Sequence, residues 1–330
     1  MTFSFRPAIR EQIPLLLGII GPTWTGKTFS ALRVGTGIVS VRGGKLVGID
    51  TEARRMLQYA DDFKFTYSEF APPFSSLRYA EALKAAAVEA QGGCVIVDSQ
   101  SHEHEGPMGY LEFHAAEVQR LIKEGGFRNE YSAAIPAWNK PSAERRVLIN
   151  TILQLNCAFI FCFRAKEKIK PVKGGSPIEL GWQAIAGEEF GYEMTARCLL
   201  TPGAKGVPDW TPEAEKLGVP KRIKDHESIL RNGRQLDEAV GEELARWATN
   251  RQTAPSQSTP GPTLPAGAGV TGEGATYISA ADLLALEAEV ERKGIKGRFS
   301  AKLQASKIAS PDQIPAGKVK AIRDWVNDAR

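Results

Sequence analysis

The sequence predicts an α/β protein with a mostly parallel sheet covered by helices on both faces. Three observations favour this class. Short and nearly continuous apolar runs recur along the first 250 residues, helical patterns lie between them, and a glycine-rich segment follows the first run. Strands that are apolar along their whole length are buried on both faces, and their alternation with helices is typical of parallel sheets.

The apolar runs give the expected strands, which are residues 14–20 (PLLLGII), 45–50 (KLVGID), 94–99 (CVIVDS) and 157–163 (CAFIFCF). Apolar residues at helical spacing predict helices at about 27–40, 76–91 and 142–156.

Composition bounds the class of protein. The 330 residues are 42% hydrophobic, which is ample for a packed core, and the net charge of +4 is mild, so any basic patch must be local. The four cysteines are far apart in strand-like runs and form no CxxC pair, which favours small buried hydrophobes in a reducing compartment: Cys94, Cys157, Cys162 and Cys198. The N-terminal residues lack the apolar core of a signal peptide, and no apolar run is long enough to span a bilayer. We therefore expect a soluble, cytoplasmic protein.

The chain divides into three parts. Residues 1–250 form the expected core, and residues 251–276 are dominated by proline, glycine, serine and threonine, which predicts a flexible linker. Residues 277–330 are expected to form a small helical module. Its helices are predicted from a cap at Ser279 and Asp282, from the spacing of Leu283, Leu286 and Val290, from residues 299–315, and from residues 316–329.

Residues 21–28 fit the phosphate-loop pattern G-x-x-x-x-G-K-[ST] at every fixed position. Gly26 lets the backbone approach a phosphate closely, Lys27 reaches the β- and γ-phosphates, and the Thr28 hydroxyl ligates Mg²⁺. The alternative to a nucleotide-binding loop is an ordinary glycine-rich turn. That alternative does not explain why a lysine and a hydroxyl follow the second glycine. We expect ATP to bind at Gly21, Pro22, Thr23, Trp24, Thr25, Gly26, Lys27, Thr28 and Phe29.

Two carboxylates are expected to complete the site. Asp98 ends an apolar run, as in a Walker B strand, and is predicted to hold Mg²⁺ from the strand next to that of the phosphate loop. Glu52 follows the run 45–50, and because parallel strand ends emerge at the same edge of a sheet, it is a candidate base for the attacking water. The alternative for Glu52 is a solvated loop residue beside Arg54 and Arg55.

These motifs together resemble the RecA-type P-loop ATPase core over roughly residues 12–202. The resemblance rests on the phosphate loop, on I-D-T-E at residues 49–52 and on V-I-V-D-S at residues 95–99. Residues 159–170 (FIFCFRAKEKIK) are similar to a strand and basic segment of bacteriophage RecA-like ATPases, including the RecA-core branch of phage single-strand annealing proteins. In that family the glutamate matching Glu52 activates water. The chain departs from the recombinases in having short DNA-binding loops.

The resemblance implies a Mg²⁺-dependent ATPase that acts on single-stranded DNA in phage recombination, in the cytoplasm of the host. It also implies a homo-oligomer with ATP sites between neighbours. The tail resembles small helical modules that end several phage recombination proteins, which implies contacts with phage or host recombination or single-strand-binding proteins.

The basic stretch 164–176 follows the last predicted core strand. Lys168, Lys170 and Lys173 are expected to contact DNA in a flexible loop. Arg164 and Lys166 are candidates to reach the γ-phosphate, in the same subunit or a neighbour. The alternative is a solvated basic loop.

Other assignments remain open from the sequence alone. A P-loop small-molecule kinase and a helicase-loader-like regulatory ATPase are the rival functions. A metal site within residues 102–105 (HEHE) is not expected, because no distant Cys or His has a suitable spacing. Residues 203–228 are rich in turns, and their role is undecided.

Overall fold

The computed structural model describes residues 13–170, 176–249, 286, 289–290, 292–294, 296–306, 308 and 314–328. The chain divides into two compact units, Met1–Pro255 and Ser256–Arg330, which are described separately. The predicted linker, residues 251–276, lies outside the described residues.

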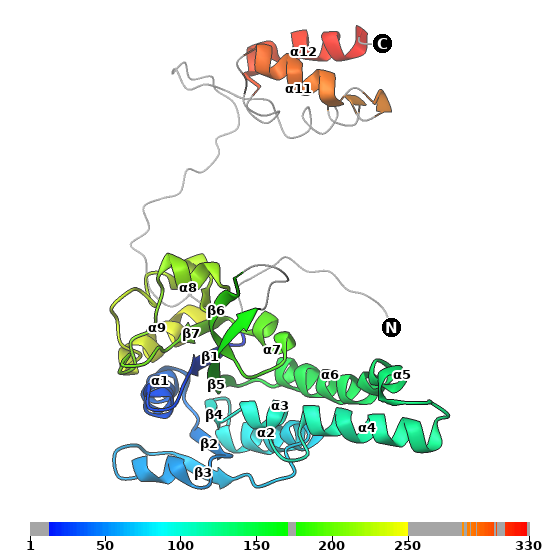
Figure 1. Cartoon of the computed structure of the whole chain (residues 1–330). Coiled ribbons are helices and arrows are strands. Elements are labelled where there is room, and N and C mark those ends of the chain that lie inside the picture. The colour runs from blue at the N-terminus through cyan, green and yellow to red at the C-terminus, as the bar shows by residue number, and fades with distance from the viewer. Residues whose placement is uncertain are drawn as a thin grey trace, which may run out of the picture. The chain divides into compact units, whose positions relative to one another are not determined.

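One sheet organises the first unit (Figure 1). Its neighbours run in the order β3-β2-β4-β5-β1-β7-β8, and β6 pairs with β5. The contacts from β3 to β7 are parallel, while β8 pairs with β7 and β6 pairs with β5 in antiparallel fashion. The strands are β1 (Leu16–Gly21), β2 (Leu46–Asp50), β3 (Thr66–Glu69), β4 (Cys94–Asp98), β5 (Ala158–Lys170), β6 (Ile178–Ala184), β7 (Ala196–Leu199) and β8 (Lys221–Arg222).

The helices of this unit include the three that the sequence predicts. These are α1 (Lys27–Arg42), α2 (Ser76–Ala90) and α6 (Asn139–Gln154). The others are α3 (Ser101–Glu105), α4 (Tyr110–Glu124), α5 (Glu130–Ala134), α7 (Glu188–Glu193), α8 (Pro212–Lys216) and α9 (Glu238–Ala248), with 3₁₀ turns η1 (Arg55–Tyr59), η2 (Pro136–Trp138) and η3 (Lys224–His226). Residues 203–228 thus contain α8, β8 and η3.

Side chains alternate between two faces of the sheet, and each face carries its own core. Leu17 and Ile19 of β1 pack with α1 and α9, whereas Leu16 and Ile20 lie in the opposite cluster with α2 and α6. Figure 1 shows α1 and α9 on one side of the strands and α2 and α6 on the other. The predicted α/β class, with a mostly parallel sheet flanked by helices, is confirmed.

The close packing of α1 on α9 depends on a missing side chain. A Cβ built on Gly37 would lie 1.9 Å from the Glu238 carbonyl oxygen, so only glycine fits there without movement. Arg33 of α1 forms an ion pair with the Glu238 carboxylate at 2.6 Å, which fixes the register of the two helices.

Strand β5 corrects two expectations. It lies between β4 and β1, so Asp98 is not on the strand next to the phosphate-loop strand. In addition, the predicted basic loop from Arg164 begins as a strand. β5 pairs with β1 as far as Arg164 and then continues to Lys170 as one arm of an antiparallel hairpin with β6. The antiparallel pairing with β6 therefore involves the part of β5 that extends beyond its pairing with β1.

The second unit contains α11 (Lys296–Ala305) and α12 (Ala316–Asp328). Its small core consists of Leu286, Val290, Phe299, Leu303, Ile308, Ile314, Ile322 and Val326. Helix α12 matches the predicted helix at 316–329, and α11 is the expected intermediate helix, starting three residues earlier than 299. Ser279, Asp282 and Leu283 lie outside the described residues.

All four cysteines are buried and free, as expected for small hydrophobic side chains. Among the described residues, no helix is both long and apolar enough to cross a membrane.

Candidate functional site

The loop that joins β1 to α1 leaves the first backbone N–H groups of α1 without a side-chain cap. Gly26 has φ of 89°, a left-handed conformation that suits glycine, and α1 starts at the next residue. No side chain caps the start of α1, and no acidic residue lies in its first turn. The free N–H groups and the positive end of the helix dipole therefore favour an anion at this loop.

Lys27 spans the same loop. Its Nζ donates a hydrogen bond to the Pro22 carbonyl oxygen at 2.8 Å, and its side chain lines a cavity of about 570 Å³. We call this cavity the edge cavity, lined by Thr23, Trp24, Gly26, Lys27, Thr28, Glu52, Arg55, Gln58, Tyr59, Asp98 and Arg164. Burial lowers the pKa of Lys27, and the charges of Asp98 and Glu52 act in the opposite direction.

The two predicted Mg²⁺ ligands touch each other. The Thr28 hydroxyl donates to Asp98 Oδ2 at 2.5 Å, although the two residues are 70 positions apart in the chain. Asp98 is almost fully buried, and this burial raises the pKa of its carboxyl to about 6 despite the hydrogen bond from Thr28. A hydroxyl and a carboxylate are hard oxygen donors of the kind that Mg²⁺ uses together with substrate phosphates and water.

The metal prediction rests on this pair alone. Within the part of the chain that the structure describes, no group of three or more His, Cys, Asp or Glu side chains is arranged to hold a metal ion. His102 Nδ1 lies 2.7 Å from the Thr51 hydroxyl, and its ring stacks on Phe74.

Glu52 lies in the edge cavity and is held by arginines. Its Oε1 accepts hydrogen bonds from Arg164 Nε at 2.9 Å and is 2.8 Å from Arg164 Nη2, while Oε2 is 3.4 Å from Arg55. Burial acts to raise the pKa of Glu52, but the hydrogen bond and charge of Arg164, with smaller contributions from His102 and Arg55, leave that pKa below its usual value. The carboxylate is therefore ionised at neutral pH.

The turn that carries Glu52 is organised by a buried carboxylate. Asp50, the last residue of β2, accepts hydrogen bonds from the Glu52 N–H at 2.6 Å and from the Met56 N–H at 2.9 Å. These two bonds fold residues 51–55 back on the strand end and start η1. Because Asp50, Asp98 and Cys162 are paired in register across β2, β4 and β5, Glu52 emerges at the same sheet edge as Asp98.

The sequence analysis missed three residues of η1. Arg55, Gln58 and Tyr59 line the edge cavity beside Thr28, and Tyr59 contacts Phe29 with ring centroids 5.8 Å apart. Phe29, predicted from the sequence to bind ATP, does not line the edge cavity and packs also against Phe63. The only sequence signal was a polar and aromatic pair, Gln58 and Tyr59, shortly after the candidate base.

Two other residues of the predicted phosphate loop support the loop and do not line the edge cavity. Gly21 is the buried last residue of β1, and the Thr25 hydroxyl is buried and donates to the Pro22 carbonyl at 3.0 Å. Trp24, in contrast, is 96% exposed at the cavity mouth.

The basic residues of the hairpin lie at different places. Arg164 lines the edge cavity, but Lys166 does not, and its amine is 3.9 Å from the Glu105 carboxylate. Lys168 lines a second cavity. Lys170 is the last residue of β5, its side chain is outside the described part, and Lys173 lies outside the described residues.

The comparisons with known proteins add no assignment. No protein-family model matches this chain, and no curated protein matches it significantly.

Proposed function

We propose that this chain is a RecA-like P-loop ATPase that binds and hydrolyses ATP with Mg²⁺ and acts on single-stranded DNA in recombination. The observation that carries the proposal is the convergence of Lys27, Thr28, Asp98, Glu52 and Arg164 on one cavity at the carboxyl edge of a parallel sheet. In open α/β sheets, ligands bind at that edge.

Each residue has a role that its chemistry suits. The loop amides and Lys27 hold the phosphates, and Thr28 with Asp98 would hold Mg²⁺, which neutralises phosphate charge when bound. Gln58 and the Tyr59 ring add a polar group and an aromatic face to the lining of the edge cavity, which suits the base of the nucleotide.

Glu52 acts as the base or orienting group for water. In the present arrangement its carboxylate is engaged by Arg164 at 2.8 Å and is not free to accept a proton. Terminal phosphate oxygens in the same cavity compete for the Arg164 guanidinium, since arginine binds phosphate in the same bidentate way as carboxylate. Exchange of Arg164 from Glu52 to phosphate frees the carboxylate only when a nucleotide is present.

The DNA-binding part of the proposal rests on the hairpin. Lys166 and Lys168 lie on β5 directly beyond Arg164, so a strand bound along the hairpin is connected to the catalytic residues through one continuous strand. Subunits are proposed to assemble with ATP sites between neighbours, which gives the exposed Trp24 at the cavity mouth a protein surface to cover it. The second unit is proposed to dock phage or host recombination or single-strand-binding proteins, in the host cytoplasm.

The test is ATP hydrolysis measured with and without single-stranded DNA, at fixed salt. The proposal expects Mg²⁺-dependent turnover that DNA stimulates. Turnover that requires a nucleoside acceptor would instead identify a kinase, and slow hydrolysis that responds to a replication protein but not to DNA would identify a regulatory ATPase. Light scattering with and without ATP and Mg²⁺ tests assembly.

A further inference from the structure

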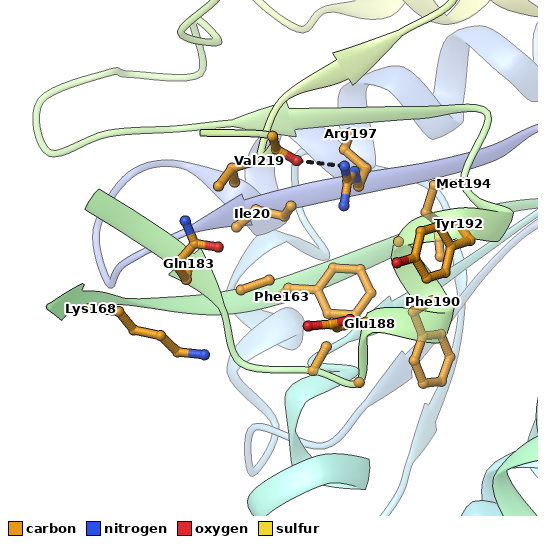
Figure 2. Close-up of a pocket in the computed structure, with 15 residues that line it drawn as sticks. Ile20, Phe163, Lys168, Gln183, Glu188, Phe190, Tyr192, Met194, Arg197 and Val219 are labelled. Atoms are coloured by element: carbon orange, nitrogen blue, oxygen red, sulfur yellow. Dashed lines mark hydrogen bonds between the residues drawn. The ribbon is translucent and has the colours of Figure 1, made fainter. Parts of the chain in front are cut away.

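A second cavity lies at the base of the β5–β6 hairpin, apart from the edge cavity (Figure 2). Its volume is about 350 Å³, and its walls come from β1, β5, β6, β7 and α7. None of the residues that line it also lines the edge cavity. A cavity of this volume is at the small end of ligand sites and suits one compact group rather than an extended segment.

One wall presents a cation whose hydrogen bonds are incomplete. Arg197 is half-buried on β7, and one terminal nitrogen donates to the Gly218 carbonyl oxygen at 2.6 Å. Its Nε–H is buried and has no hydrogen-bond partner in the part of the chain that the structure describes. Burial also lowers the pKa of this guanidinium. A buried donor without an acceptor is costly, and the same side chain lines the cavity, so the cavity suits a ligand that carries an acceptor oxygen.

A second cation faces the same space from the hairpin. Lys168 is exposed, lines the cavity and forms no ion pair with any described residue. Figure 2 shows Lys168 on the hairpin strand and Arg197 on a separate strand, with Glu188 and Gln183 also at the cavity. Two cations and one carboxylate suit a ligand that carries an anionic group together with N–H donors.

The rest of the cavity is apolar and aromatic. Phe163, Phe190 and Met194 are buried and form its inner wall. Tyr192 is 73% exposed at the rim, where its ring is available to a ligand. An exposed ring beside a cavity with an apolar wall favours a planar group that stacks.

We propose that this cavity, the hairpin pocket, accepts one unstacked base of a single-stranded DNA, with the adjoining backbone phosphates at Lys168 and Arg197. The ring of Tyr192 stacks on the base, and Glu188 and Gln183 face the polar edge of the base. This combination of phosphate, ring and donors is found in a nucleotide unit, and the basic hairpin leads the strand to the pocket. The inference rests on the DNA-binding part of the proposed function.

The experiment compares two oligonucleotides of equal length on the full chain. One is oligo-dT, and the other has the same backbone with every base replaced by an abasic unit. Binding is followed by fluorescence anisotropy at fixed salt for the wild type, Tyr192→Ala, Lys168→Gln and the matched control Tyr131→Ala, which removes another exposed tyrosine. Circular dichroism and thermal melting check that each variant is folded.

Tyr192→Ala is expected to weaken oligo-dT binding about 5- to 150-fold and to leave binding of the abasic strand unchanged. Lys168→Gln is expected to weaken both strands and to lower the slope of log affinity against log salt by about 0.7. Tyr131→Ala is expected to match the wild type.

Two results overturn the inference in distinguishable ways. If the wild type binds oligo-dT but Tyr192→Ala binds it equally well, or loses the two strands equally, the pocket holds no base, while the proposed function stands. If the folded wild type binds ATP but neither strand, the DNA-binding part of the proposed function fails as well.

Discussion

At the scale of single residues, the state of Glu52 depends on a competition among its neighbours. Burial disfavours its charge, whereas Arg164 at 2.8 Å favours it, and the arginine prevails. The ion pair with Arg164 keeps the Glu52 carboxylate ionised, and it also engages the oxygen that would accept a proton. Under the proposed function, hydrolysis would require both residues, each for a different reason.

Substitution of the candidate base tests its role directly. Glu52→Gln keeps the shape of the side chain but cannot accept a proton, so we expect ATP binding to persist and kcat to fall by about 10²- to 10⁴-fold. The measurements are steady-state hydrolysis and binding of a fluorescent ATP analogue. Glu69→Gln, at the end of the neighbouring strand β3 and outside the edge cavity, is the matched control. Normal hydrolysis by Glu52→Gln would show that the base lies elsewhere.

The pH dependence of kcat/KM distinguishes the effects of Arg164 and Arg55 on the pKa of Glu52. In the proposed mechanism the ionised form of Glu52 is the active one. Because its pKa is lowered, wild-type kcat/KM is expected to fall only when the pH drops through that lowered value. Arg164→Gln removes the main favourable contact and leaves the effect of burial, which raises the pKa and moves the acid limb of kcat/KM to higher pH. We also expect kcat to fall, because phosphate loses its arginine.

Arg55→Gln is the matched control for that profile. Arg55 is exposed and contacts Glu52 at 3.4 Å, so its loss should move the acid limb less than the loss of Arg164. Equal acid limbs in the wild type and Arg164→Gln would mean that the ion pair does not set the pKa of Glu52 in the working enzyme.

Substitution of Lys27 is expected to weaken ATP binding and not only to slow hydrolysis. Charged hydrogen bonds contribute roughly 1.5–3 kcal/mol, so Lys27→Ala should raise the Kd for ATP by about 10- to 150-fold. Isothermal titration calorimetry measures the change. Lys45→Ala, which removes a surface lysine paired with Glu89, should leave the Kd unchanged. Unaltered ATP affinity in Lys27→Ala would contradict the phosphate loop itself.

At the scale of elements, the sequence predicts those parts whose signal is local. Strands β1, β2, β4 and β5 contain nearly continuous apolar runs, and the phosphate-loop motif locates the start of α1 at Lys27. Strands β3 (TYSE) and β8 (KR) carry no such run, and β7 (ARCL) interrupts its own run with Arg197. Four residues or fewer give too little periodicity to detect.

The η1 residues of the candidate site could not be predicted from the sequence for a different reason. Lys27, Thr28, Asp98 and Glu52 were found because each belongs to a motif or follows a strand. The η1 residues reach the edge cavity only because the Asp50 carboxylate binds two backbone N–H groups and folds the turn back. The placement of β5 between β4 and β1 is likewise set by pairing between distant segments, which no local pattern encodes.

The contact between α1 and α9 gives a prediction at this scale. A methyl group at Gly37 would overlap the Glu238 carbonyl, so Gly37→Ala should push the helices apart and destabilise the first unit by about 1–3 kcal/mol. Urea unfolding measures the shift in the midpoint. Val88→Ala, at a 79% exposed position of α2, should change stability by less than about 0.5 kcal/mol. If Gly37→Ala unfolds with the wild-type midpoint, the helices do not pack this closely in solution.

At the scale of the whole molecule, the two units have separate cores of very different size. Both clusters that flank the sheet end at or before Ala248, and the cluster of the second unit starts at Leu286. The second unit is therefore expected to have the smaller free energy of unfolding, because a domain of this size rarely gains more than about 3–5 kcal/mol from its core.

This separation predicts the thermal behaviour of the chain. Scanning calorimetry of the full chain should show two transitions, a weak one at lower temperature from the second unit and a larger one from the sheet. A fragment that ends at Pro255 should lose only the weak transition and keep the larger one at the same temperature, with unchanged kcat and KM for ATP. A single transition in the full chain, shifted to lower temperature in the fragment, would show that the second unit stabilises the first. Addition of ATP with Mg²⁺ should raise only the larger transition, since ligand binding stabilises the unit that binds it.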